Sequence, residues 1–392
     1  MKDEKKAPKL RFKGFTDDWE QRKVSELADR YDNLRVPITA SERVAGETPY
    51  YGANGIQDYV EGFTHNGEFV LVAEDGANDL QNYPVQYVDG KVWVNNHAHV
   101  LQAKEERADN KFLTNALKHT NIEPYLVGGG RAKLNADVMM KINFKVPTLP
   151  EQVQIGKFFD NLDHLITLHE EKKRQLERLK SALLQKMFAD KSGYPAVRFE
   201  GFGGKWDQCK LGNVGTFRGG FGFPENEQGN IDGIAFYKVS DMNDSCNTLT
   251  MRKASNYVTS SQISKNKWKP ILNQNIIFAK VGAAVYLERK RKAMGPFLLD
   301  NNMMAFQPKD ADIDYIYYVF QRLRISKHAQ VGTLPSLNAS ELRNITIYIP
   351  SLNEQKAVAD LMVSLDHTII LYDFKLELLK KLKSSLLQHM FI

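Results

Sequence analysis

Several features that would assign this chain to a common class of protein are missing from its sequence. Its 392 residues include two cysteines, Cys209 and Cys246, and neither belongs to a CxxC pair or lies at metal-ligand spacing from a histidine. A disulfide framework is therefore excluded, and two free, buried thiols are expected. No apolar stretch approaches the roughly 18 to 20 residues that span a bilayer. The first ten residues, MKDEKKAPKL, lack the apolar segment of a secretory signal, so we predict a cytoplasmic protein without membrane contact.

Motifs for catalysis are missing as well. There is no Gly-x4-Gly-Lys-[Ser/Thr] phosphate loop for ATP hydrolysis, and no Asn-Pro-Pro-aromatic or Asp-Pro-Pro-aromatic tetrapeptide for methyl transfer. His97 and His99 would lie on one face of a strand, but we identify no third metal ligand beside them. Glu74 and Asp75 are expected to be solvated acids in a loop, since no partner base is in view. No metal site and no catalytic residue are therefore predicted.

The composition is that of a globular protein with more than one domain. The sequence is 42% hydrophobic and 26% charged, and 392 residues exceed what one hydrophobic core usually serves. The net charge of +6 is modest, but it is unevenly distributed. Residues 193–348 contain 20 basic and 13 acidic side chains and carry almost the whole excess. If the chain binds nucleic acid, its first large segment must do so through local clusters or with help from a partner.

Two pairs of internal repeats organise the chain. LRFKGFTDDWEQRK (10–23) matches VRFEGFGGKWDQCK (197–210) at seven of fourteen positions. Residues 147–188 match residues 350–391 without a gap, at 19 of 42 positions and an offset of 203. Agreement at that level indicates a duplication. The segments between the repeats show no convincing alignment, apart from Leu-Asn-Ala at 134–136 and 337–339. Two dissimilar variable units, each followed by a matching segment, are therefore predicted.

Each long repeat is predicted to form a helix. Thr148-x-x-Glu151 and Ser351-x-x-Glu354 are typical of a capping box at a helix start. Apolar residues then recur every seven positions, which indicates a coiled-coil seam, and His169 and Tyr372 should loosen it at mid-helix. One such helix would be roughly 57 Å long, and two paired together would make a rigid rod. The alternative is an ordinary two-helix packing element. The seam and partner-contact candidates are Glu151, Gln152, Leu162, Leu176 and Leu183, with Glu354, Gln355, Leu365, Leu379 and Leu386 in the second copy.

These residues resemble a known family. PxLxEQ at 147–152 and 350–355, RFxGFxxxW before each variable unit, and the tandem order together look like the DNA specificity subunit of type I restriction-modification systems. The resemblance implies an α+β fold with two globular target recognition domains, each followed by a long helix, and with the helices pairing as a coiled coil in pseudo-twofold symmetry. The corresponding segments are 1–148, 149–190, 191–348 and 349–392.

The same resemblance implies partners and cofactors. Each target recognition domain would read one half of a split, asymmetric sequence in double-stranded DNA, and the helices would set the spacer between the halves. Two methyltransferase subunits that use S-adenosylmethionine would bind the chain, and restriction subunits that use ATP and Mg would join them. The chain itself would be non-catalytic and need no cofactor. From the residues alone, unlike readers on one chain imply unlike half-sites.

Candidate DNA contacts are residues that can hydrogen-bond base edges or phosphates from glycine-rich loops. They are Tyr51, Asn54, Gln57, Arg131 and Lys133 in the first unit, and Arg218, Lys280, Arg289, Lys290, Arg291, Lys292 and Ser336 in the second. The run 289–292 is expected to bind phosphates and to raise salt sensitivity. For any single residue a turn-forming or solvated role competes with base contact.

Two other functions remain open from the sequence. The chain could be a coiled-coil scaffold whose variable domains bind protein or carbohydrate, or a nuclease or methyltransferase with an unrecognised site. Affinity that falls steeply with salt would favour DNA over the first of these. DNA left unchanged by the purified chain with magnesium and S-adenosylmethionine would exclude the second.

Overall fold

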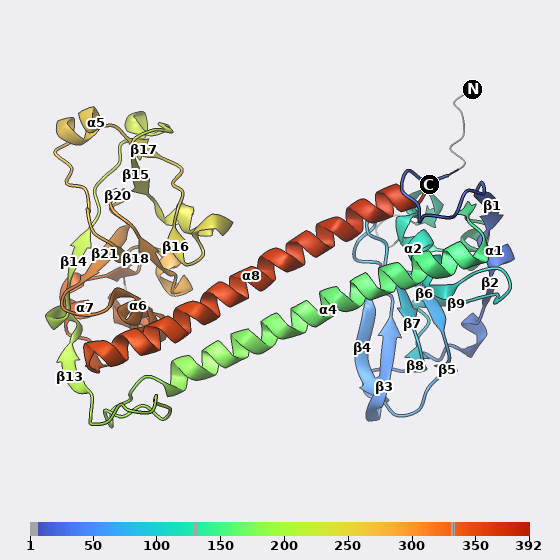
Figure 1. The fold of residues 1–392 in the computed structure, drawn as a ribbon, viewed down its shortest axis with the longest axis horizontal. Coiled ribbons are helices and arrows are strands. Elements are labelled where there is room, and N and C mark those ends of the chain that lie inside the picture. The colour runs from blue at the N-terminus through green and yellow to red at the C-terminus, as the bar shows by residue number, and fades with distance from the viewer. Residues whose placement is uncertain (1–6, 129–131, 331, 333) are drawn as a thin grey trace. The chain divides into compact units, whose positions relative to one another are not determined.

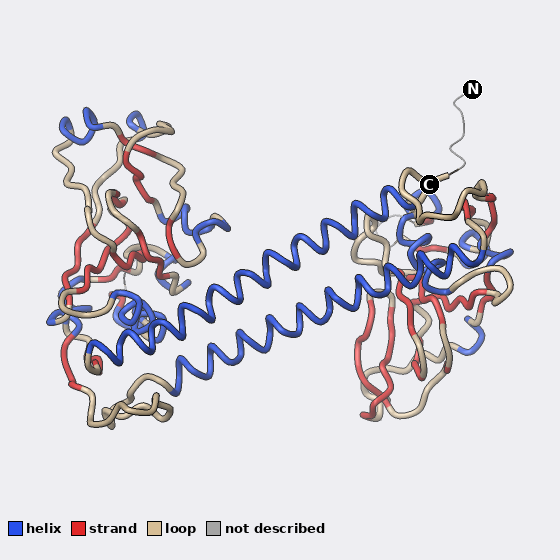
Figure 2. The backbone as a smooth tube through the Cα atoms, viewed as in Figure 1, coloured by secondary structure: helices blue, strands red, loops and turns tan. Residues whose placement is uncertain are grey.

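The computed structural model describes residues 7–128, 132–330, 332 and 334–392. The chain divides into two compact units, which Figures 1 and 2 show as strands and helices. Unit 1 comprises Met1–Glu171 with Tyr372–Ile392, and unit 2 comprises Lys172–Leu371. Each unit therefore contains one variable domain together with parts of both long helices. None of the helices in these described ranges is long and apolar enough to cross a membrane.

Unit 1 is built on two four-stranded sheets. The first has the order β2-β9-β6-β7 and the second β4-β3-β8-β5. Helix α2 packs on β7 and β6 of the first sheet, and its buried Phe112, Leu113 and Leu117 enter the main core (Figure 1). The elements are β1 (Glu20–Lys23), α1 (Val24–Leu27), β2 (Ala28–Arg30), η1 (Asp32–Leu34), β3 (Ala45–Gly52), β4 (Gly55–Val60), β5 (His65–Asn66), β6 (Phe69–Ala73), β7 (Val85–Val88), β8 (Lys91–Val94), β9 (Ala98–Ala103), α2 (Asn110–His119), η2 (Glu123–Tyr125), β10 (Leu126–Val127), β11 (Lys133–Leu134), α3 (Ala136–Met139) and β12 (Asn143–Val146).

Unit 2 has a five-stranded sheet, β14-β21-β18-β19-β16, and a three-stranded sheet, β17-β15-β20. Helix α6 packs on β19 and β18, as α2 does on β7 and β6 in unit 1. The elements are β13 (Asp207–Lys210), η3 (Leu211–Asn213), β14 (Gly215–Gly219), η4 (Glu225–Glu227), β15 (Ile234–Tyr237), η5 (Val239–Asn243), η6 (Ser245–Asn247), β16 (Thr250–Met251), β17 (Tyr257–Val258), α5 (Ser260–Lys265), β18 (Asn275–Ala279), η7 (Ala283–Leu287), β19 (Lys290–Ala293), β20 (Phe297–Leu299), β21 (Met303–Pro308), α6 (Ile313–Arg322), η8 (Ile325–His328), β22 (Ala329–Gln330), β23 (Ser336–Leu337), α7 (Ala339–Arg343) and β24 (Thr346–Ile349).

The duplication seen in the sequence reappears in strand register. Strand β1 pairs with β12 so that Glu20 faces Val146, and β13 pairs with β24 so that Asp207 faces Ile349. These partners are related by the offsets of 187 and 203 found in the sequence. The hairpins β10–β11 and β22–β23 also correspond, with Leu126 opposite Leu134 and Ala329 opposite Leu337. A turn at 95–97 separates β8 from β9, so His97 and His99 do not lie on one face of a strand as the sequence suggested.

Both predicted long helices are present, α4 (Leu149–Lys186) and α8 (Leu352–Met390). Within unit 1 their segments run antiparallel, because Asp163 pairs with Lys383 and Glu170 with Lys380. Leu162, Ile166 and Leu376 form a small buried cluster there, and Leu379 and Leu386 pack against it. His169 and Tyr372 meet with ring centroids 5.3 Å apart.

The outer parts of the predicted seam belong to the cores of the two units. In unit 2, Leu183 and Leu365 pack against the main core around α6. Leu176 is half-buried and joins none of the buried clusters of the described chain. Core formation at the helix ends therefore accounts for much of the heptad pattern.

An aromatic residue at a helix end completes each core. Phe391 stacks on Phe112 in unit 1 at 5.4 Å, and Phe188 stacks on Tyr315 in unit 2 at 5.3 Å. The core of unit 1 thus receives its last aromatic from α8, and that of unit 2 from α4. A backbone bond accompanies each contact: Leu10 N donates to His389 O, and Val197 N donates to Lys186 O, both at 2.9 Å.

The expectation of two buried thiols is wrong for one cysteine. Cys209 is half-buried on β13, whereas Cys246 is exposed in η6. Cys246 N donates to the side chain of Asp244, so the cysteine is held by a short polar turn outside the cores.

Candidate nucleic-acid interface

The repeated motifs PxLxEQ and RFxGFxxxW contact each other in both units. Arg11 donates two hydrogen bonds to the carboxylate of Glu151, each at 2.7 Å, and the Glu151 side chain is fully buried. Arg198 binds Glu354 in the same bidentate way, at 2.7 and 2.8 Å. Hydrogen bonding to the glutamate raises the pKa of each arginine. We call each of these ion pairs, together with its following glutamine, a junction clamp.

The glutamine of each clamp ties the long helix to the short helix of the domain. Gln152 donates to Pro147 O at 3.0 Å and accepts from Asp109 N at 3.3 Å. Gln355 likewise donates to Pro350 O and accepts from Asp312 N, both at 2.9 Å. Asp109 and Asp312 are the N-caps of α2 and α6. All four clamp residues from the PxLxEQ motifs are buried, so they hold the fold together and do not form an outer face for a partner.

The capping box predicted at the start of α4 is wrong, because Glu151 N donates to the backbone oxygen of Thr148, and the one predicted at the start of α8 is half correct. Ser351 Oγ accepts from Glu354 N at 3.4 Å, as such a box requires. The Glu354 and Glu151 carboxylates, however, accept from Arg198 and Arg11 and not from the cap backbone. A bidentate guanidinium is the stronger partner for a buried carboxylate.

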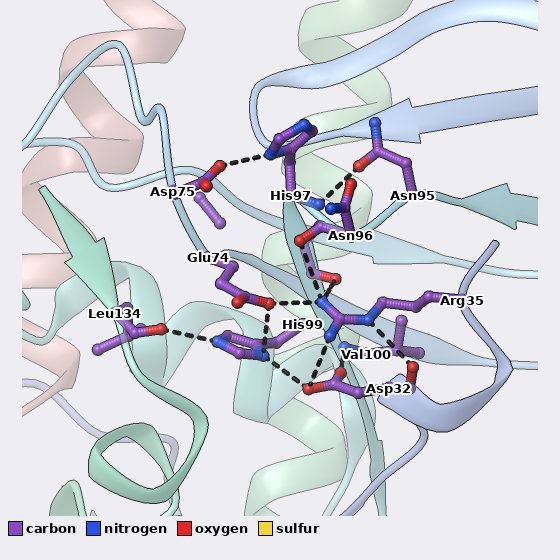
Figure 3. A network of polar contacts seen from close by, with 12 residues as sticks. Asp32, Arg35, Glu74, Asp75, Asn95, Asn96, His97, His99, Val100 and Leu134 are labelled. Atoms are coloured by element: carbon purple, nitrogen blue, oxygen red, sulfur yellow. Dashed lines mark hydrogen bonds and ion pairs between the residues drawn. The ribbon is translucent and has the colours of Figure 1, made fainter. Parts of the chain in front are cut away.

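A polar network in unit 1 joins side chains of η1, β9 and the segment after β6 to the β10–β11 hairpin (Figure 3). His99 on β9 has Nδ1 2.7 Å from Asp32 Oδ2 and Nε2 2.8 Å from Leu134 O. Arg35 donates to Glu74 Oε2 at 2.6 Å and to Ala98 O at 2.9 Å. The network therefore fastens the β10–β11 hairpin, through Leu134, to the sheet and to η1.

The carboxylates of this network are charged. Burial raises the pKa of Asp32, but the hydrogen bond from His99 and the nearby charges outweigh it and leave that pKa below its usual range. Burial also raises the pKa of Glu74, but the hydrogen bonds from Lys133 and Arg35 outweigh it and leave that pKa below its usual range. The expectation that Glu74 and Asp75 are solvated loop acids is therefore wrong, since Glu74 is mostly buried and Asp75 Oδ1 lies 2.5 Å from His97 Nδ1.

Within the described residues, Asp32, Glu74 and His99 form a group whose potential metal-ligand atoms lie within 4.8 Å of one another. Their chemistry does not suit a cation. Arg35 and Lys133 already neutralise the two carboxylates, with Lys133 Nζ 2.8 Å from Glu74 Oε1. A metal ion would have to displace Arg35 from its bonds to Glu74 and to two backbone oxygens. The arrangement is a structural support for the β10–β11 hairpin.

The first-unit candidates divide into buried supports and exposed side chains. Tyr51 packs beside the second core of unit 1, and burial raises the pKa of its hydroxyl. Asn54, in the β3–β4 turn, donates to Gly76 O at 2.9 Å and accepts from Asn78 N at 3.0 Å, so it fixes the 76–78 loop. Gln57 is exposed on β4, an edge strand. Lys133 is about half-exposed and bound to Glu74. Arg131 lies outside the described residues.

In unit 2 the structure brings Lys280 and Ser336 together. Leu337 N donates to Lys280 O at 2.8 Å, as Leu134 N donates to Glu74 O at 2.7 Å in unit 1, and Val281 bridges to Ser336. Lys280 is half-buried, and its Nζ lies next to Gly219, 3.8 Å from the position that a Cβ atom would occupy there. Arg218, on β14, donates to the carbonyls of Lys269 and Pro270. The loop after β18 and the β22–β23 hairpin of unit 2 thus correspond to the loop after β6 and the β10–β11 hairpin of unit 1.

The run 289–292 does not form the free basic patch that the sequence suggested. Lys290 is 1% exposed and pairs with Glu288. Arg289 donates to Asn243, and Lys292 pairs with Asp314 on α6. Arg291 donates to Asn247 O at 2.6 Å, and burial lowers its pKa. These residues lie in or beside β19, an inner strand between β18 and β16, where α6 covers them.

Sequence reasoning missed a groove of about 660 Å³ in unit 1. It lies between the loop after β6, helix α2 and the two long-helix segments of that unit, and three lysines line it together with several side-chain amides: Lys118, Lys380, Lys383, Asn54, Asn78 and Gln86. Of these, only Asn54 was a candidate. Lys118 precedes Lys380 and Lys383 by more than 250 residues in sequence, so no local pattern could have grouped it with them.

Comparisons with known proteins agree with the internal duplication. The family model described as "Type I restriction modification DNA specificity domain" matches residues 16–178 and 203–381. A putative type I restriction enzyme specificity subunit of Haemophilus influenzae is 31% identical over 350 residues, which are 88% of this chain and 86% of that protein. The type I restriction enzyme MjaVIII specificity subunit of Methanocaldococcus jannaschii is 21% identical and covers 95% of this chain and 91% of its own length.

A solved structure shows the same fold. The crystal structure of the S subunit of the type I restriction-modification system from M. genitalium matches with a TM-score of 0.69 at 16% identity. The match covers 98% of this chain and 99% of that one. The α+β class and the two domains, each followed by a long helix, are therefore confirmed.

Proposed function

From its membership of the type I restriction-modification DNA specificity family, to which this chain belongs, we propose that its two domains read two different half-sites of one asymmetric DNA target. Sequence specificity for DNA and assembly of the type I complex are the functions of this family. The finer statement, that the target is bipartite and unlike in its two halves, rests on what the two units share and where they differ.

The observation that supports it is an identical frame bearing different side chains. The junction clamps, the β1–β12 and β13–β24 registers and the bonds from Leu134 and Leu337 are the same in both units. When the two units are aligned at the acceptors of the Leu134 and Leu337 bonds, Glu74 corresponds to Lys280. The strand pairings Val72–His99 and Phe278–Met304 then place His99 of unit 1 at the position of Met304 in unit 2. His99 and Met304 are both buried, so the two frames differ in the side chains that support their loops. Two equal frames with unlike supports would hold unlike surfaces to DNA and select unlike base sequences.

We further propose that the long helices fix the spacer between the half-sites and that other subunits carry out the reactions. Two modification subunits would supply adenine methylation with S-adenosylmethionine, and restriction subunits would supply ATP- and Mg-dependent translocation and cleavage. The support is the family resemblance and the absence of nucleotide-binding and methyltransferase motifs from this sequence. Chromosomal DNA as target fits a cytoplasmic site of action.

Mapping of methylated adenines tests the proposal. Genomic DNA from cells carrying the complete system is compared with DNA from cells in which the gene for this chain is deleted. The expected result is one methylated motif made of two different short sequences at a fixed separation, present only with the chain. A palindromic motif, or unchanged methylation after the deletion, contradicts the proposal.

A further inference from the structure

The groove of unit 1 contains three lysines whose ionic partners are unequal. Lys383 Nζ lies 2.5 Å from Asp163, and Lys380 Nζ lies 2.6 Å from Glu170. Lys118, near the C-terminus of α2, has no hydrogen bond or ion pair to any residue that the structure describes. It also lies near Lys383, and it is the one lysine of the groove without an ion pair in the described chain, although the carboxylate of Asp79 lines the opposite wall.

Burial makes this imbalance costly. Lys118 is half-buried, and the desolvation that this causes is the main reason why its pKa is lowered. Repulsion from Lys383 lowers the pKa further, and Asp163 opposes both effects only in part. An ammonium group that is partly desolvated and has no acceptor in the described chain is held less favourably than one with an ionic partner. An anion entering the groove would supply the missing acceptor.

The other wall of the groove presents amides. The β6–β7 loop is fixed from within, because Asn54 holds Gly76 and Asn78, and Asp79 accepts from the backbone of Gln81 and Asn82. The side chains of Asn78 and Gln86 line the groove and make no hydrogen bond within the described chain. An asparagine or glutamine amide can make two hydrogen bonds to one edge of adenine, at N6 and N7. Asp79 also lines this wall, but its carboxylate already accepts hydrogen bonds from Gln81 and Asn82 of its own loop. Cations on one wall and free amides on the other suit the backbone and base edges of DNA.

Unit 2 lacks this arrangement at equivalent positions. With the offset of 203, Lys118 corresponds to Gln321, and Lys380 corresponds to Glu177. Lys383 alone has a lysine counterpart, Lys180, which pairs with Asp366 as Lys383 pairs with Asp163. Gln321 donates to Lys290 O at 3.4 Å and so faces the sheet of its own domain. The cationic groove is thus a property of unit 1, the half of the chain without a net basic charge.

We propose that Lys118, supported by Lys380 and Lys383 of α8, holds a backbone phosphate of DNA in this groove, beside the bases that Asn78 and Gln86 face. The proposal rests on the proposed function and deepens it. The C-terminal part of α8, which Figure 1 shows beside α2, then belongs to the DNA-binding surface of unit 1 and does not act as a spacer alone.

The test is the salt dependence of DNA binding by the complex of the full chain with its modification subunits. The duplex carries the motif found by methylation mapping, and the dissociation constant is measured from 50 to 300 mM salt. Lys118→Met removes one cation of similar length. It should weaken binding roughly tenfold and reduce the slope of log K against log salt by about 0.9, the value for one phosphate. Preference for the cognate over a scrambled half-site should be unchanged.

Three controls separate the outcomes. Gln321→Met, at the equivalent position of unit 2, should change neither affinity nor slope, and Lys118→Arg should restore both. The melting temperature of Lys118→Met should stay equal or rise, because a half-buried charge without an ionic partner is removed. Lys118→Met with wild-type slope and affinity, or with a lowered melting temperature, overturns the proposal. Failure of the wild-type complex to prefer its motif would instead reject the proposed function.

Discussion

Breaking the junction clamp of unit 1 should produce one of the largest single-residue effects on stability in the chain. The Glu151 side chain is fully buried and Arg11 is 13% exposed. Arg11→Met leaves that carboxylate in the core without its ionic partner, which typically costs about 3 to 5 kcal/mol. For a unit of this size, each kcal/mol lowers the melting temperature by about 2 to 4 °C, so a drop of roughly 6 to 20 °C is expected for unit 1.

The double variant Arg11→Met/Glu151→Met provides the decisive comparison. Replacing a buried ion pair by apolar side chains of similar volume is often neutral or stabilising, so the double variant should recover to within about 1 kcal/mol of wild type. Hydrogen exchange read by mass spectrometry reports each unit separately and should place the loss in unit 1. If the double variant is as unstable as Arg11→Met, the buried-charge explanation is refuted.

The second clamp offers an internal control. In unit 2, Trp206 Nε1 also donates to Glu354, at 3.3 Å, whereas Trp19 Nε1 of unit 1 is buried without a partner in the described chain. Glu354 therefore retains one donor when its arginine is removed. Arg198→Met should cost less than Arg11→Met, and an equal or larger cost would mean that the tryptophan bond contributes nothing.

Three further predictions follow from other parts of the fold. Inserting one heptad at matched points of α4 and α8 adds about 10 Å of helix, so the spacer of the methylated motif should lengthen by roughly two to three base pairs; an unaltered spacer would show that the helices do not set it. Phe391→Ala removes a ring that stacks on Phe112 and should destabilise unit 1 by about 3 to 5 kcal/mol, while exchange in unit 2 stays as in wild type. Because the pKa of Asp32 is lowered in the folded chain, its contribution is present above the unfolded pKa of about 3.9 and is lost as the pH falls through the lower folded value. Acid titration of unit 1 should therefore become shallower in Asp32→Asn, and an identical acid transition in wild type and variant would contradict this linkage.

The repeats made the frame of the molecule predictable, because duplicated residues make duplicated contacts. Offsets of 187 and 203 read from the sequence reappear as strand partners at Glu20–Val146 and Asp207–Ile349. Local motifs were less informative where a distant residue competed. Glu151 has the spacing of a capping-box residue, but it is buried against an arginine 140 positions earlier in the chain.

Charge patterns in the sequence were the least reliable guide to the DNA-binding surface. Four adjacent cations at 289–292 suggested a phosphate site, yet three of them lie on the inner strand β19, and Lys290 is 1% exposed. The three lysines of the groove come from α2 and α8 and become neighbours only because the end of α8 closes the core of unit 1. Such a site depends on tertiary packing and leaves no periodic signal.

The backbone bonds Leu10–His389 and Val197–Lys186 each join the end of a long helix to the start of a repeat. The order of the two repeats is therefore circular, and the chain termini lie at one of two equivalent junctions. A polypeptide cut instead between 190 and 196, with residue 392 linked to residue 1, would keep every clamp and both cores. A half-length product ending near residue 190 would lack Phe391, which completes the core of unit 1, and would carry Phe188 without the core that Phe188 completes. Two such products could complete one another, and the resulting self-associated protein would recognise the same sequence twice in inverted orientation.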